Sequence, residues 1–133
     1  MRDHEVAVVV HRPNARFLVL LRSPARGGYW NLVAGGVEPG EPAGDAAARE
    51  LAEETGLRAA VTPVAVELAY EKPWGRVRLD VFAAEAPAGW EPTLNEEHVT
   101  HRWCSEREAI ELLAYPEPRA AVHEVARAPG AHA

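Results

Sequence analysis

The sequence predicts an α/β fold of the α+β type, in which a mixed β-sheet is sandwiched between helices. Strand-length runs rich in Val, Phe and Leu lie on both sides of one well-delimited helix, and two further helical segments follow near the C-terminus. A chain of 133 residues can bury a sizeable core without disulfides or zinc. We therefore expect one domain spanning residues 1–133, with no internal repeat or linker.

The N-terminal segment predicts a β-hairpin followed by a short strand. Residues 4–11 and 16–21 are rich in Val, Phe and Leu, and Pro13-Asn14 marks a turn between them. Residues 23–28 have the composition of a loop, and residues 29–33 (Tyr-Trp-Asn-Leu-Val) favour a strand.

A helix is predicted between Pro42 and Gly56. Proline suits the first helical turn, the alanines at 46–48 favour helix, and glycine fits the position just past the last turn.

The second half of the chain predicts a second hairpin and two helices. Residues 61–70 and 77–84 alternate apolar and polar side chains in part, and residues 72–76 form a bulky tip between them. After a loop at 87–92, we expect a strand at 99–104 and helices at 107–114 and 118–127. The tail after residue 128 is expected to fray.

Composition and charge narrow the class of partner. The net charge of −6 argues against a nucleic-acid polymer, whose phosphates are bound through clustered Lys and Arg. No apolar stretch approaches the roughly 20 residues of a membrane span, and the N-terminus lacks a signal-peptide layout. The single cysteine, Cys104, cannot form an internal disulfide, so a cytoplasmic location is expected.

Three glutamates of the predicted helix point to a bound cation. Glu50 precedes Glu53 by three residues and Glu54 by four, so the three carboxylates share one helix face and repel each other. A positive group must therefore lie against this face. Mg²⁺ is the candidate, because it takes oxygen ligands and keeps substrate phosphates in its shell.

The segment 35–57 resembles the Nudix box, Gly-x5-Glu-x7-Arg-Glu-aliphatic-x-Glu-Glu-x-Gly-aliphatic. Every fixed position of this pattern is present: Gly35, Glu41, Arg49, Glu50, Leu51, Glu53, Glu54, Gly56 and Leu57. The resemblance implies the Nudix fold, a mixed sheet between helices. It also implies a Mg²⁺-dependent Nudix hydrolase, with Mn²⁺ as a substitute, that acts on a small nucleotide-type substrate.

The resemblance assigns roles to the residues of the box. Glu50, Glu53 and Glu54 are implied metal ligands, and a carbonyl of the glycine loop, Gly35 here, completes the shell. Gly36 belongs to the same loop, where the backbone must come close to substrate. We expect Arg49 and Glu41 to hold the carboxylates in register.

The implied reaction is attack of water on a phosphorus of a nucleoside diphosphate linked to another group. Glu53 is our first candidate for the general base, with Glu54 beside it as a catalytic carboxylate. The run from Glu97 to Trp103 resembles the Glu-His-x-x-x-(Lys/Arg)-Trp run of bacterial dihydroneopterin triphosphate pyrophosphohydrolases and related (d)NTP-cleaving Nudix enzymes. This similarity implies that Glu97 is a metal ligand or the base, and that Arg22 contacts phosphate.

Several alternatives stay open at this level. Trp74 at the hairpin tip could stack on a nucleobase, or pack against protein. The position of Pro73 beyond the box is similar to that in ADP-ribose pyrophosphatases, so ADP-ribose or a dinucleoside polyphosphate is the alternative substrate. A non-catalytic nucleotide-binding domain is the alternative of another class. Dimers are common in the family, which makes a homodimer one implied assembly.

Overall fold

The computed structural model describes residues 3–128. Its strands follow the chain in the order β1 (His4–Arg12), β2 (Arg16–Arg22), β3 (Trp30–Asn31), β4 (Val33–Gly36), β5 (Thr62–Pro63), β6 (Leu68–Lys72), β7 (Gly75–Glu85) and β8 (His98–Cys104). The helices are the 3-10 turn η1 (Pro24–Arg26), α1 (Ala43–Thr55), α2 (Glu106–Leu112) and α3 (Pro116–Arg127). In residues 3–128, no helix is both long and apolar enough to cross a bilayer.

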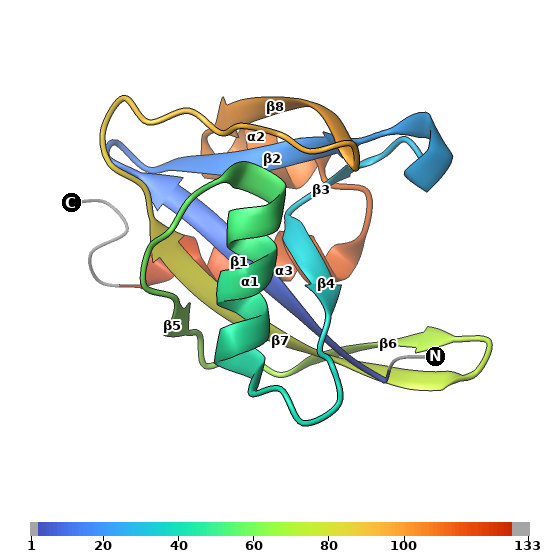
Figure 1. Ribbon diagram of the computed structural model, residues 1–133. Coiled ribbons are helices and arrows are strands. Elements are labelled where there is room, and N and C mark those ends of the chain that lie inside the picture. The colour runs from blue at the N-terminus through green and yellow to red at the C-terminus, as the bar shows by residue number, and fades with distance from the viewer. Residues whose placement is uncertain (1–2, 129–133) are drawn as a thin grey trace.

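The strands form one mixed sheet in which β1 is the central strand. β1 pairs antiparallel with β2 and β4, and parallel with β7 over residues 4–11 and 78–85. β8 extends the sheet beyond β2, and β6 pairs with the first half of β7. The hairpin of β6 and β7 projects from the body of the molecule (Figure 1). Both expected hairpins are confirmed, and the second turns at Pro73-Trp74.

Alternation along β1 divides the core into two layers. Ala7 and Val9 face one side of the sheet, where α2 and α3 contribute apolar residues such as Ala109 and Val122. Val6, Val8 and Val10 face the other side and pack against Ala46, Ala47 and Leu51 of α1. Each face of the sheet is thus covered by helix, and the predicted sandwich is confirmed (Figure 1).

Two predicted strands are divided in the structure. The strand expected at 29–33 is broken at Leu32, because β3 pairs with β2 whereas β4 crosses over to pair with β1. The strand expected at 61–70 is broken between β5 and β6, where the pairing register with β7 changes. The Val64 N–H still donates to the Val81 carbonyl at 2.9 Å, so the break lies between Val64 and β6.

The helix boundaries follow the capping residues. α1 begins after Pro42 and ends at Gly56, whose φ of 81° is the left-handed conformation that glycine adopts most easily. α2 begins one residue earlier than predicted, at a capping box formed by Ser105 and Glu108. The expected fraying of the tail concerns residues 129–133, which lie outside the described part of the chain.

The loop between β7 and β8 is fastened to the sheet through Glu91. The Glu91 carboxylate accepts hydrogen bonds from Trp103 Nε1 at 2.8 Å and Arg12 Nη1 at 3.0 Å, and it lies 3.0 Å from His101 Nε2. These partners, Trp103 first, lower the pKa of Glu91 to about 2. The anchor matters for function because the same loop leads to Glu97.

We expect Glu91→Gln to lower the melting temperature at pH 7 but not at pH 2. A carboxyl group whose pKa is depressed by folding stabilises the native state above its unfolded value, about 4.3, and that stabilisation is lost as pH falls toward about 2. Thermal unfolding of both proteins followed by circular dichroism from pH 7 to pH 2 measures the difference. A gap between the two that stays constant with pH would contradict the role given to the charge.

Candidate active site

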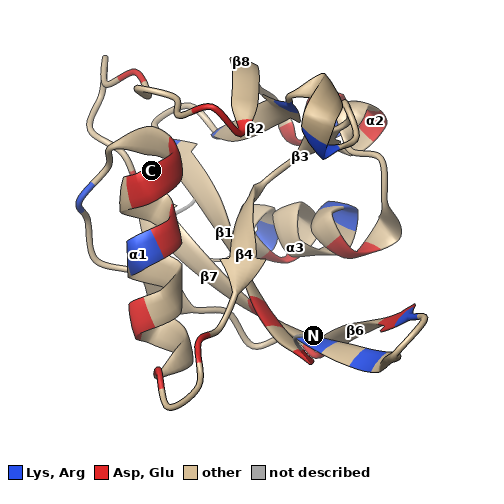
Figure 2. Ribbon diagram, turned by 45° about the vertical axis from the view of Figure 1, so that its right-hand side comes forward, with Lys and Arg blue, Asp and Glu red and all other residues tan. Residues whose placement is uncertain are grey.

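Helix α1 presents its acidic residues toward the edge of the sheet where β4 ends. Its small apolar residues Ala46, Ala47 and Leu51 are buried against the sheet, which fixes the rotation of the helix. Figure 2 shows acidic segments along α1 with one basic segment among them. That basic residue is Arg49, the single Lys or Arg in the helix.

Arg49 is the positive group that lies against the acidic face. Its guanidinium makes a bidentate pair with Glu41, through Nε and Nη2 at 3.0 Å each, and Nη2 also donates to the Gly36 carbonyl at 3.0 Å. Nη1 lies 2.7 Å from Glu50 and 3.6 Å from Glu53. The hydrogen bond to Glu41, followed by the contacts with Glu50, raises the pKa of Arg49 further above its ordinary value. The arrangement ties the glycine loop to the helix.

Glu54 differs from its neighbours because it is buried. It is 1% exposed, whereas the Glu53 side chain is 52% exposed, so the predicted shared face is divided between core and solvent. Glu54 Oε1 accepts a long hydrogen bond from the Ala34 N–H at 3.4 Å, and Oε2 has no hydrogen-bond partner. Burial, followed by the nearby Glu50 carboxyl, raises the pKa of Glu54 far above its usual value.

His98 is the neighbour of Glu54 on the side of β8. Its Nε2 lies 3.8 Å from Glu54 Oε1, its side chain is 1% exposed, and neither ring nitrogen has a hydrogen-bond partner among the described residues. Desolvation by burial lowers the pKa of His98. His98 therefore lies behind the carboxylates rather than in the open cavity.

Gly35 leaves room for the Glu50 carboxylate. A Cβ placed on Gly35 would lie 2.3 Å from Cδ of Glu50 and within 2.6 Å of both its oxygens. Glu50 is itself 8% exposed and held by Arg49. The backbone of β4 and the carboxylate of α1 thus approach each other in a way that only glycine permits.

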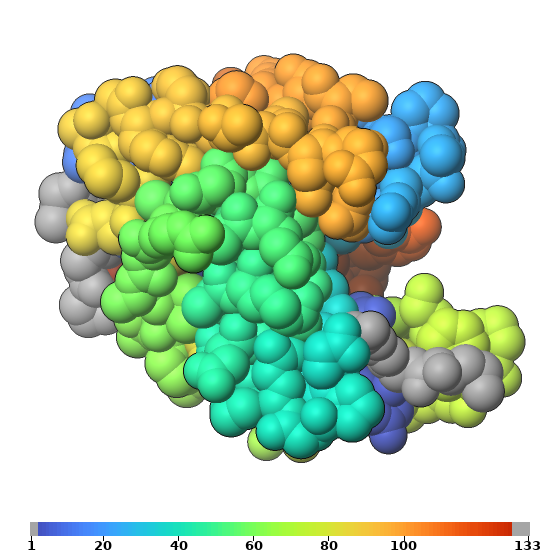
Figure 3. Space-filling view, viewed as in Figure 1, coloured from blue at the N-terminus to red at the C-terminus, as the bar shows by residue number. Residues whose placement is uncertain are grey.

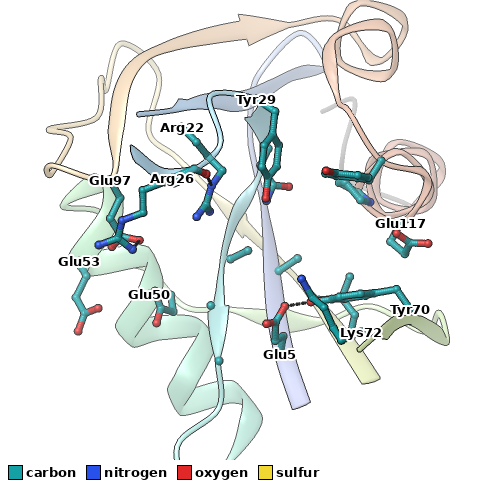
Figure 4. A pocket seen from close by; sticks show the side chains of 18 of the residues that line it. Glu5, Arg22, Arg26, Tyr29, Glu50, Glu53, Tyr70, Lys72, Glu97 and Glu117 are labelled. Carbon is teal, nitrogen blue, oxygen red and sulfur yellow. Dashed lines mark hydrogen bonds and ion pairs between the residues drawn. The ribbon is translucent and has the colours of Figure 1, made fainter. Parts of the chain in front are cut away.

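Glu97 and two arginines complete this end of the site. Arg26, in the turn η1, donates to Glu97 at 3.2 Å, and Asn95 Nδ2 donates to the other Glu97 oxygen at 3.2 Å. Arg22 at the end of β2 donates through Nε to the Arg26 carbonyl at 2.8 Å. The Arg26 guanidinium lies beside Glu97, and the Arg22 guanidinium lies between Glu97 and Tyr29 (Figure 4).

A cavity of about 610 Å³ extends from these residues toward three tyrosines. We name its two ends by their residues: the carboxylate end comprises Glu50, Glu53 and Glu97, and the tyrosine end comprises Tyr29, Tyr70 and Tyr115. Arg26 is paired with Glu97 at the carboxylate end, and Arg22 lies between that end and Tyr29 (Figure 4). The opening is visible in Figure 3 as a notch between the segment of η1 and the β6–β7 hairpin.

Comparison with known proteins identifies the family to which this fold and the segment 35–57 belong. The sequence model described as NUDIX domain matches residues 1–125. The chain belongs to the NUDIX family. The predicted resemblance is confirmed, and so is the fold class.

The relatives of this NUDIX chain include proteins of several activities. It is 38% identical over 120 residues to an octanoyltransferase of Myxococcus xanthus, covering 86% of this chain and 34% of that protein. The E. coli dihydroneopterin triphosphate pyrophosphohydrolase superposes with a TM-score of 0.82 at 24% identity, over 92% of this chain and 93% of the other. A C. elegans Ap4A hydrolase superposes with a TM-score of 0.78 at 26% identity, over 91% and 93%. The chain spans 34% to 50% of the length of three curated relatives it matches.

The NUDIX box supplies the chemistry of a divalent-cation site. Hydrolases of this family generally use divalent cations such as Mg²⁺. Among residues 3–128, no three His, Cys, Asp or Glu side chains stand together as a ready-made site. However, the donors near the box are oxygen atoms, and the partnerless Oε2 of Glu54 is a buried acceptor that a cation would satisfy. The residues present therefore fit a hard divalent ion.

The cavity brings together most of the residues predicted from the sequence of this NUDIX chain. Its lining includes Arg22, Gly35, Gly36, Glu50, Glu53 and Glu97. Glu54 lies just behind it. Trp74 is 44% exposed at the tip of the β6–β7 hairpin and is not among the lining residues, so its role in stacking stays a prediction.

Sequence reasoning missed Arg26 and the whole tyrosine end. Arg26 follows a serine and a proline in a loop, where no spacing rule connects it with Glu97. Tyr29, Tyr70 and Tyr115 lie in different elements, and the sheet brings them to one cavity. The sequence shows that these three residues are aromatic, but it does not show that they line the same cavity.

Proposed function

We propose that the chain hydrolyses a phosphoanhydride bond of a (d)NTP or of a close analogue such as dihydroneopterin triphosphate, with Mg²⁺ as cofactor, releasing a monophosphate and pyrophosphate. The observation that carries this proposal is the layout of one cavity. Carboxylates of α1 and Glu97, the latter paired with Arg26, lie at one end, Arg22 lies between, and three tyrosines line the other end. A polyphosphate ester joined to a planar ring needs these three environments in that order.

The metal ligands of the proposal are Glu50, Glu53, Glu54, Glu97 and the Gly35 carbonyl. A cation held there supplies charge neutralisation on phosphate oxygens and a lower pKa for the attacking water. Arg49 holds Glu50 in place through one hydrogen bond, and it holds the glycine loop by donating another to the Gly36 carbonyl. Arg22 in the middle of the cavity and Arg26 at its carboxylate end both line it and are placed to bind phosphate oxygens.

Two carboxylates are candidates for the general base. Glu53 is our first choice, because it lines the cavity and its side chain is 52% exposed, which leaves it free to meet a water molecule. Glu97 is the alternative, although its pairing with Arg26 and Asn95 favours a fixed carboxylate that binds metal.

Glu97→Gln is expected to slow turnover by about tenfold if Glu97 is a ligand, and by about 10³-fold or more if it is the base. The measurement is kcat at saturating Mg²⁺ for the variant and the wild type. Glu96→Gln, the adjacent residue outside the cavity lining, is the matched control and should keep wild-type turnover. Unchanged activity of Glu97→Gln would remove the loop from the site.

The test of the proposed function is a Mg²⁺-dependent phosphate-release assay with identified products. The substrates are the dNTPs, dihydroneopterin triphosphate, ADP-ribose and dinucleoside polyphosphates. Preferred cleavage of a triphosphate to a monophosphate and pyrophosphate is the expected result. Preferred cleavage of a dinucleoside polyphosphate, the substrate named for the C. elegans neighbour, would establish the alternative enzyme. Nucleotide binding without any turnover would indicate a non-catalytic binding domain.

The octanoyltransferase match does not enter this proposal. It extends over a third of that protein, so acyl transfer is not carried over to this chain. A homodimer is proposed from the family alone, a cytoplasmic location from the unpaired Cys104, and a single domain over residues 1–133 from the length of the chain.

A further inference from the structure

The tyrosine end of the cavity carries a specific set of hydrogen-bonding groups. Glu5 of β1 and Glu117 of α3 line it, together with Lys72 at the end of β6 (Figure 4). The Tyr70 hydroxyl donates to Glu5, which fixes the orientation of the ring. The Glu117 carboxylate has no hydrogen-bond or ion-pair partner within residues 3–128. The Glu117 carboxylate is therefore an acceptor available to a ligand at this end, beside aromatic walls.

The aromatic walls suit a flat ring. Tyr29 and Tyr115 meet edge to face with centroids 5.1 Å apart, and Leu79 and Pro118 add apolar surface nearby. A heterocycle can stack on such side chains whatever its identity. Selection between heterocycles must then come from the polar groups at the rim, as in any apolar pocket with few hydrogen-bonding residues.

We propose that Glu117 binds the two adjacent N–H donors of a 2-amino-4-oxopyrimidine ring, as found in guanine and in pterins. This inference rests on the proposed function, because it assigns the ring of the same substrate. A carboxylate has two acceptor oxygens, and these match a ring N–H next to an exocyclic amino group. Lys72 is the donor placed to bind the neighbouring ring carbonyl.

Other nucleobases do not match this arrangement. Thymine and uracil flank their single N–H with two carbonyl oxygens, which a carboxylate repels. Adenine and cytosine place a ring acceptor next to the amino group, so one carboxylate oxygen would face a lone pair. Hypoxanthine keeps the ring N–H and the carbonyl of guanine but lacks the amino group, which makes it the sharpest comparison.

The alternative is a purely structural role for Glu117. It lies in the first turn of α3, where a negative charge favours the helix dipole. A structural carboxylate would affect melting temperature without affecting the choice between ligands. The experiment must therefore measure selectivity.

The test is calorimetric titration of GMP, IMP, dTMP and dihydroneopterin monophosphate in the presence of Mg²⁺. These monophosphates lack the anhydride bond, so binding is measured without hydrolysis. We expect GMP to bind about tenfold more tightly than IMP, which is the lower range for one bidentate contact. dTMP should bind still more weakly. The ratio of GMP to dihydroneopterin monophosphate distinguishes a guanine from a pterin substrate.

Glu117→Gln should bring the affinities of GMP and IMP to within about threefold of each other, since an amide presents a donor where the ring also has one. Glu124→Gln, on the same helix and outside this cavity, should keep the wild-type ratio. Equal affinity of the wild type for GMP and IMP, or an unchanged ratio in Glu117→Gln, would overturn the inference.

Failure of the proposed function gives a different result. Guanine-selective binding without hydrolysis of any triphosphate would remove the enzymatic proposal and leave the ring assignment intact. Hydrolysis of dGTP and dTTP at equal kcat/KM would support the enzymatic proposal and remove the ring assignment.

Discussion

Replacing Glu54 by Gln is expected to lower kcat by about 10²-fold or more while making the metal-free protein more stable. The loss of activity follows from removal of one charged ligand of the proposed cation, whose effect on the transition state amounts to several kcal/mol. The gain in stability follows from burial, since Glu54 is 1% exposed and one of its oxygens has no partner. An amide at the same position is neutral in both states, so it does not have to take up a proton when the protein folds at neutral pH.

The pH dependence of stability gives an independent readout for Glu54. Its pKa is raised by folding, so the folded state retains a proton that the unfolded state loses above about pH 4.3. The wild type should therefore lose stability relative to Glu54→Gln as pH rises from 4 to 8. Melting temperatures over that range in a chelating buffer measure this difference.

Metal binding distinguishes the loss of a metal ligand from the gain in stability in Glu54→Gln. Mn²⁺ should raise the melting temperature of the wild type more than that of the variant, because a ligand stabilises the state that binds it. Asp45→Asn, an exposed change near the start of the same helix, should keep wild-type turnover and Mn²⁺ affinity. Near-normal kcat of Glu54→Gln at saturating Mg²⁺ would remove Glu54 from the proposed ligands.

Gly35→Ala is expected to reduce turnover by about 10²-fold with the fold retained. The new methyl group would lie 2.3 Å from Cδ of Glu50, so the carboxylate must move away from β4. Displacing a reacting or metal-binding group by about 1 Å is enough to cost two orders of magnitude in rate. The stability loss should be about 1–3 kcal/mol, as for an overpacked core site.

Gly44→Ala is the matched control for Gly35→Ala. Its Cβ would lie 3.8 Å from the Phe82 ring, an ordinary contact, and alanine favours helix over glycine. Turnover should be unchanged, and stability equal or higher by up to about 1 kcal/mol. If Gly35→Ala has the same turnover as Gly44→Ala, the close approach of β4 and Glu50 has no catalytic importance.

The fold class was predictable because its signals are local. Residues 4–11 and 16–21 could be recognised as a hairpin from a turn between two apolar runs, and α1 from its proline, alanines and closing glycine. The divisions at Leu32 and after Pro63 were not predictable. They depend on which neighbour each strand pairs with, and pairing partners are set by the whole sheet.

The candidate site was predictable at its carboxylate end alone. The glutamates of the box are close in sequence, so helical spacing brings them together before any tertiary structure forms. Spacing could not distinguish Glu54, which is buried, from Glu53, which is exposed, because that depends on how α1 packs. The tyrosine end is assembled from the loop before β3, from β6 and from the residue before α3, and no short-range pattern connects Tyr29 with Tyr70 or Tyr115.

The parallel pairing of β1 with β7 has a consequence for synthesis of the protein. β1 is synthesised before the other strands of this sheet, but one of its edges pairs with residues 78–85, which are made much later. During that interval β1 and β2 can meet, whereas the other edge of β1 keeps its backbone N–H and carbonyl groups unpaired. Such long-range contacts form slowly, and an open apolar strand can associate with other chains. The most buried strand of the native protein is thus the one that the nascent chain leaves exposed for longest.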